Sequence, residues 1–68
     1  MDINIRQAVL QNVSGSSEEE ITATIEDAIS RKEEKMLPGL GVLLEVYWNE
    51  AEEQKRNELV QSITQGLS

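Results

Sequence analysis

Carboxylates are the most abundant chemically active side chains, with 13 acidic groups among 68 residues. Paired carboxylates can transfer protons or bind a hard cation such as Ca²⁺. Here they occur in three short runs: Glu18-Glu19-Glu20, Glu33-Glu34 and Glu52-Glu53. Neighbouring helical residues point about 100° apart, so each run spreads around its helix, and no acidic calcium loop is present. We predict solvated helix faces here in preference to weak divalent binding, and no metal site.

Nucleophiles and phosphate-binding loops are also poorly represented. Histidine and cysteine, the commonest general base and the strongest nucleophile, are both absent. Ser14, Ser16 and Ser17 have no such base and lie in no G-x-S-x-G pattern. The glycines of residues 38–41 lack the lysine of a phosphate-binding loop. The sequence predicts no catalytic or cofactor-binding residue, no cofactor and no small-molecule substrate, so the protein is not expected to be an enzyme.

Basic residues form two clusters that could contact a phosphate backbone. Arg31, Lys32 and Lys35 make the denser cluster, and Lys55 and Arg56 make the second. Glutamates are interleaved with both, and a cation near a helix C-terminus compensates the helix dipole without any ligand. The net charge of −7 repels a polyanion, since phosphate neutralisation supplies much of the affinity for DNA. We expect no nucleic-acid partner, with weak phosphate contact by the first cluster as the alternative.

Two helices are predicted in the N-terminal half. Apolar residues at helical spacing follow Asp2, a good N-cap, and indicate a first helix from about Ile3 to Asn12. A Ser-Gly-Ser breaker ends it. Ser17 and Glu20 then form a capping-box pattern at the start of a second helix, Glu18 to about Lys32.

The central segment allows two conformations. Pro38 and Gly39 suit the central positions of a β-turn, so we predict a turn over residues 36–41. The apolar residues of 41–48 fit a helical stripe and also a strand alternation. A lone strand would leave its backbone groups unpaired unless a second copy supplied them. We therefore predict a helix, with the strand left open.

A last helix is marked by four apolar residues at helical spacing: Leu59, Val60, Ile63 and Leu67. Gly66 is its expected stop. The resulting fold is a single all-α domain over residues 1–68, a small bundle of three to four short helices. The N-terminus does not resemble a signal peptide. The longest apolar stretch, residues 36–48, is shorter than the about 20 residues a bilayer requires, so we expect a cytosolic protein without a membrane partner.

One helix is apolar nearly all round, because Glu45 is the single charge between Gly41 and Asn49. Such a helix is normally buried on more than one side. A chain without disulfides or histidine can bury it in its own core or against a second chain. It is therefore either a central core helix or a surface for self-association or another partner. The candidate surface comprises five residues: Leu40, Leu43, Leu44, Tyr47 and Trp48.

Residues 33–43, EEKMLPGLGVL, resemble the central block of the small acid-soluble spore protein I family. The opening residues Met1 to Asn4, with Arg6, Ala8 and Val9, resemble the start of that family. The resemblance implies a minor protein of the spore core in Bacillus-like bacteria, made in the forespore cytoplasm, and it implies no known biochemical activity.

Three hypotheses follow from these patterns. The leading one is a non-enzymatic structural protein of the spore core that interacts with a second copy of itself, as a homodimer, or with another spore-core protein. The alternative is a DNA-binding protein of the spore nucleoid, against which the acidic balance argues. The third is an amino-acid store, against which the predicted caps and core argue.

Overall fold

A computed structural model describes residues 4–68, which form four α-helices and one short 3₁₀ turn. In chain order these are α1 (Ile5–Val13), α2 (Glu18–Arg31), η1 (Glu34–Met36), α3 (Leu37–Glu50) and α4 (Glu53–Leu67). Within the described residues no strand occurs, so the predicted all-α class is confirmed. Residues 41–48, for which a strand was left open, are helical. No helix of residues 4–68 has both the length and the apolar character needed to cross a bilayer.

The first helix is capped by Asn4. The side-chain oxygen of Asn4 accepts a hydrogen bond from the backbone N–H of Gln7 at 2.9 Å, so Asn4 is the N-cap and the helix begins at Ile5. Asparagine caps a helix about as well as aspartate does, and α1 runs to Val13, one residue past its predicted end. The approximate predicted start, Ile3, and the expected cap, Asp2, lie outside the described residues.

The capping box of α2 is confirmed. Ser17 Oγ accepts from the backbone N–H of Glu20 at 3.2 Å, and Glu20 Oε1 accepts from the backbone N–H of Ser17 at 3.1 Å. The hydrogen bond that the Glu20 carboxylate accepts from the Ser17 backbone, followed by one from the Ser17 side chain, lowers the pKa of Glu20. The helix ends at Arg31, one residue before its predicted end, because Lys32 takes the left-handed conformation with φ of 53°.

The turn predicted for residues 36–41 is wrong. Pro38 lies in the first turn of α3, and Gly39 continues the helix. Among the described glycines, Gly15 alone has a positive φ. A fixed φ of about −65° suits the first turn of a helix as well as a β-turn, and the missing N–H has no intrahelical partner there. The break between α2 and η1 comes earlier, at Lys32 and Glu33.

The last helix begins earlier than its apolar markers indicate and ends at the last of them, Leu67. It begins at Glu53, within the polar stretch, and a link of Ala51 and Glu52 joins it to α3. The prediction that Gly66 ends it is also wrong, since Gly66 is helical and the helix continues to Leu67. A glycine inside a helix costs about 1 kcal/mol relative to alanine, which a helix tolerates.

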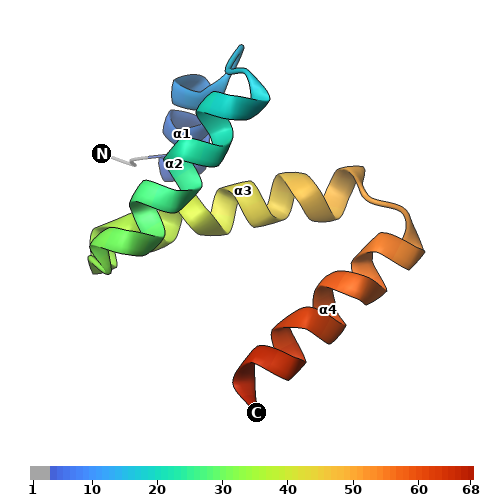
Figure 1. The fold of residues 1–68 in the computed structure, drawn as a ribbon. Coiled ribbons are helices and arrows are strands. Elements are labelled where there is room, and N and C mark those ends of the chain that lie inside the picture. Colours follow the sequence, from blue (N-terminus) through green and yellow to red (C-terminus); the bar gives the residue numbers. More distant parts are fainter. Residues whose placement is uncertain (1–3) are drawn as a thin grey trace.

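The helices surround a very small core. Both α1 and α2 pack on α3, whereas α4 leaves the far end of α3 and extends away from the other helices (Figure 1). In residues 4–68 the single buried hydrophobic residue is Val42, at 6% exposure. The fold thus covers one side of the apolar helix α3 and leaves α4 without a neighbour along most of its length.

Candidate association surface

The inner side of α3 faces the rest of the fold. Leu40 and Leu43 are half-buried and line an apolar cavity of about 350 Å³ together with Val9 and Val13 of α1 and Ala28 of α2. Two residues of the candidate surface therefore contribute to the interior between the first three helices.

The outer face of α3 is defined by Leu37, Leu44 and Trp48. At about 100° per residue, Leu44 and Trp48 lie within about 20° of Leu37 around the helix, and Val42 lies about 140° away. The three outer side chains are 40–60% exposed. Tyr47 flanks them and is also exposed. The candidate surface thus divides, and only Leu44, Tyr47 and Trp48 lie on the outside of the fold.

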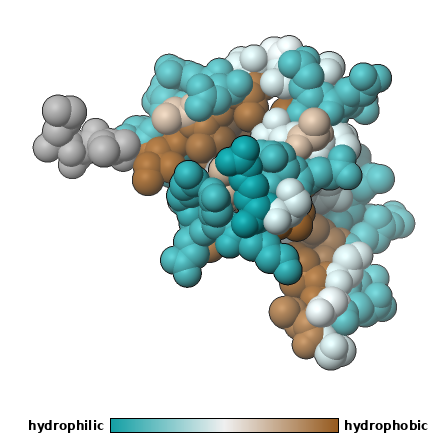
Figure 2. All heavy atoms as spheres, turned by 60° about the vertical axis from the view of Figure 1, so that its left-hand side comes forward, coloured by the Kyte–Doolittle hydropathy of each residue, from teal (hydrophilic) through white to brown (hydrophobic). Residues whose placement is uncertain are grey.

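The α4 stripe is a second exposed apolar surface, and it comprises Val60, Ile63 and Leu67. These side chains are 47–82% exposed, and helical spacing places Val60 and Leu67 within about 60° of Ile63. Figure 2 shows a hydrophobic strip along the lower arm of the molecule, where α4 lies, bordered by hydrophilic side chains. Neither Leu37 nor the α4 stripe was expected as surface: Leu37 was assigned to a turn, and the α4 residues marked the last helix of the bundle.

Contacts at the corner between α3 and α4 set the direction of α4. Arg56 Nε donates a hydrogen bond to the Trp48 carbonyl oxygen at 2.8 Å, and its guanidinium lies 5.3 Å from the centroid of the Trp48 ring. The hydroxyl of Tyr47 donates to the Lys55 carbonyl oxygen at 3.4 Å. Ile63 lies about 20° from Arg56 around α4, so the α4 stripe and the outer face of α3 border the same open angle.

The basic cluster of residues 31–35 lies where α2 ends. Arg31 Nε is 3.0 Å from Asp27 Oδ2, and Lys35 Nζ is 3.4 Å from Glu33 Oε2. Both pairs are exposed and contribute little to stability. They place a carboxylate beside two of the three cations, so a phosphate would have to compete for them. Across residues 4–68, no group of three or more acidic residues is arranged to hold a metal ion.

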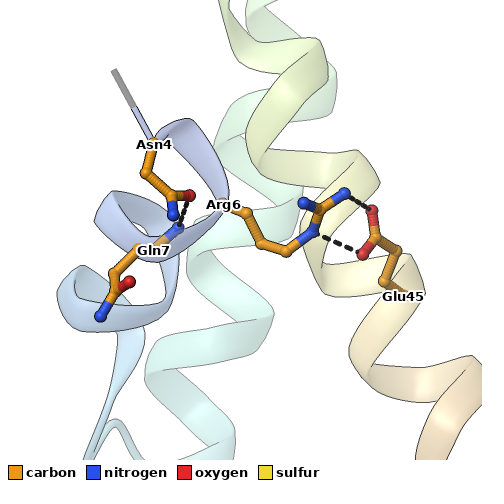
Figure 3. A network of polar contacts seen from close by, with 4 residues as sticks. All are labelled: Asn4, Arg6, Gln7 and Glu45. Atoms are coloured by element: carbon orange, nitrogen blue, oxygen red, sulfur yellow. Dashed lines mark hydrogen bonds and ion pairs between the residues drawn. The ribbon is translucent and has the colours of Figure 1, made fainter. Parts of the chain in front are cut away.

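Arg6 of α1 and Glu45 of α3 form a two-pronged ion pair that the sequence patterns did not indicate. Arg6 Nε lies 2.7 Å from Glu45 Oε2, and Nη2 lies 2.9 Å from Oε1 (Figure 3). The hydrogen bonds from Arg6 lower the pKa of Glu45, and the same contacts raise the pKa of Arg6. The single charge on the apolar segment of α3 therefore joins α3 to α1.

Comparison with known proteins points to one family. Residues 3–67 match the family described as small, acid-soluble spore protein I. A protein of that name from Halalkalibacterium halodurans is 57% identical over 67 residues, covering 98% of each chain. The Bacillus licheniformis protein is 57% identical and the Bacillus subtilis protein 52% identical, each over 98% of this chain and 96% and 94% of their own. No solved structure gives a significant match.

Proposed function

We propose that this chain, which belongs to the small, acid-soluble spore protein I family, is a non-enzymatic structural protein of the spore core that acts by associating with other protein. The family is named for a spore protein and not for an enzyme. The core location, the absence of catalysis and the association are the proposed part.

The exposed apolar side chains of α3 carry this proposal. Leu37, Leu44 and Trp48 are each at least 40% exposed, on a helix whose inner side holds the single buried hydrophobic residue among residues 4–68. Contiguous exposed apolar surface with an aromatic anchor is typical of interaction sites. The wider candidate surface, Leu40 to Trp48, thus supplies both an inner part that supports the fold and an outer part that can bind protein.

The DNA-binding alternative gains no support from the arrangement of charges. Arg31 and Lys35 each have a carboxylate within 4 Å, and Arg56 of the second cluster is engaged with Trp48. The net charge of −7 opposes approach to a polyanion.

Sedimentation velocity of the purified protein, alone and with a labelled random-sequence DNA duplex, tests the proposal. Low salt favours phosphate contacts, so an unchanged duplex under these conditions counts against DNA binding. We expect an unchanged duplex and, for the protein alone, a species larger than the monomer at high micromolar concentration. Added salt should strengthen association between two chains of like charge and weaken binding to DNA. A duplex that sediments faster with the protein would overturn the proposed partner class.

A further inference from the structure

We infer that the partner is a second copy of this chain, with α4 of each copy packed against the outer face of α3 in the other. This inference rests on the proposed function and specifies its partner. Each chain carries both halves of the contact, the outer face of α3 and the α4 stripe. Two copies related by a two-fold axis, as in most homodimers, would therefore make the same contact twice.

The two helices match in length and pattern. α3 has 14 residues and α4 has 15, which correspond to about 21 and 22 Å at 1.5 Å per residue. The outer face of α3 is a single apolar line, and the α4 stripe is another. The α4 stripe occupies the C-terminal half of α4, residues 60–67, and can pack on the longer line of α3 with side chains interdigitating, as helix pairs in bundles do.

Apart from the contact of Arg56 with Trp48, the chain does not cover these surfaces itself. Arg56 and Trp48 hold the first turn of α4 at the end of α3, and from there the two helices diverge (Figure 1). Ile63 and Leu67 lie farther along α4, where they remain 47% and 82% exposed. The same corner that separates the helices leaves an open angle between them, and a helix of a second copy can enter it.

The accessible surface area of the chain is larger than a compact monomer of its mass would expose. A compact folded protein of 7.6 kDa is expected to expose about 4,300 Å². This chain exposes 5989 Å², which exceeds that expectation by about 1,700 Å². A stable dimer of standard size buries about 800 Å² on each partner. The excess is therefore large enough for two reciprocal helix contacts.

Disulfide cross-linking between separately purified single-cysteine variants tests the pairing. The native chain has no cysteine, so every disulfide reports an introduced pair. Leu44 lies near the middle of the outer face of α3, and Ile63 lies near the middle of the α4 stripe, so the two residues approach each other whichever way the helices run. We expect an equimolar mixture of Leu44→Cys and Ile63→Cys to form the mixed disulfide dimer under mild oxidation. Gln61→Cys is the matched control, because Gln61 lies about 200° from Ile63 around α4 and should not cross-link to Leu44→Cys.

A charge substitution supplies an independent readout. Ile63 is exposed in the single chain, so Ile63→Lys should fold with unchanged helical circular dichroism and weaken the dimer at least about tenfold. Gln61→Lys changes the net charge equally and should leave the dimer intact. If the dimer survives Ile63→Lys, and Leu44→Cys cross-links to itself and not to Ile63→Cys, the packing of α4 on the partner copy is refuted. The two copies would then associate through α3 alone. If the native chain remains monomeric at high micromolar concentration, the second copy is refuted as the partner. The measurement with the DNA duplex would still decide whether the partner is another protein or DNA.

Discussion

Replacement of Val42 by alanine tests the description of the core most directly. Val42 is 6% exposed and lies on the side of α3 that faces α1 and α2. The substitution removes two methyl groups, worth about 0.8 kcal/mol each by transfer from water. A partly collapsed cavity adds to this loss, so the free energy of unfolding should fall by about 2 kcal/mol.

That loss is a large share of the total stability. Globular proteins gain about 0.05–0.15 kcal/mol per residue, so a chain of 68 residues has about 3–10 kcal/mol in all. For a domain of this size, 1 kcal/mol shifts the melting temperature by about 4–8 °C. Val42→Ala should therefore lower the melting temperature by about 10 °C.

Val46→Ala provides the matched control, because it makes the same change one turn further along α3. Val46 is 46% exposed, and the gain in helix propensity is common to both variants. Thermal unfolding followed by circular dichroism should place Val46→Ala within about 0.5 kcal/mol of the native chain. Equal melting temperatures for the two variants would refute the assignment of Val42 as the centre of the core.

Three further predictions concern the polar contacts. Arg6 lowers the pKa of Glu45 below its ordinary value of 4.5. The ion pair therefore stabilises the fold above pH 4.5, and this stabilisation is lost as the pH falls through the lowered pKa. Glu45→Gln should therefore flatten the loss of melting temperature between about pH 6 and pH 2, and an unchanged profile would count against the pair. Ser17→Ala should cost about 1 kcal/mol through loss of the N-cap, measured by urea unfolding, whereas no change would show that the cap is dispensable. Arg56→Gln should increase acrylamide quenching of Trp48, the single tryptophan, because the guanidinium no longer covers its ring; equal quenching would contradict the corner contact.

Parts of the candidate surface could be predicted because they depend on local spacing. The helical stripe of α3 placed Leu44, Tyr47 and Trp48 in one candidate group, and all three are exposed. Which of the apolar residues of α3 face inward could not be predicted, because α3 is apolar nearly all round and offers no polar face to orient it. The packing of α1 and α2 makes that choice by half-burying Leu40 and Leu43.

Sequence alone determined the features whose partners are close along the chain. The capping box of Ser17 and Glu20 joins residues three apart, and the absence of a second strand partner favoured a helical α3. Such interactions form within one turn, so their residue types are sufficient to predict them.

Tertiary structure decided the features whose partners are distant or whose local preferences are equal. Arg6 and Glu45 are 39 residues apart, and no spacing rule connects them. Pro38 fits a β-turn and a helix N-terminus equally well by its φ, and the chain places it in the first turn of α3. The direction of α4 likewise depends on the contact between Arg56 and Trp48, which exists only once both helices have formed.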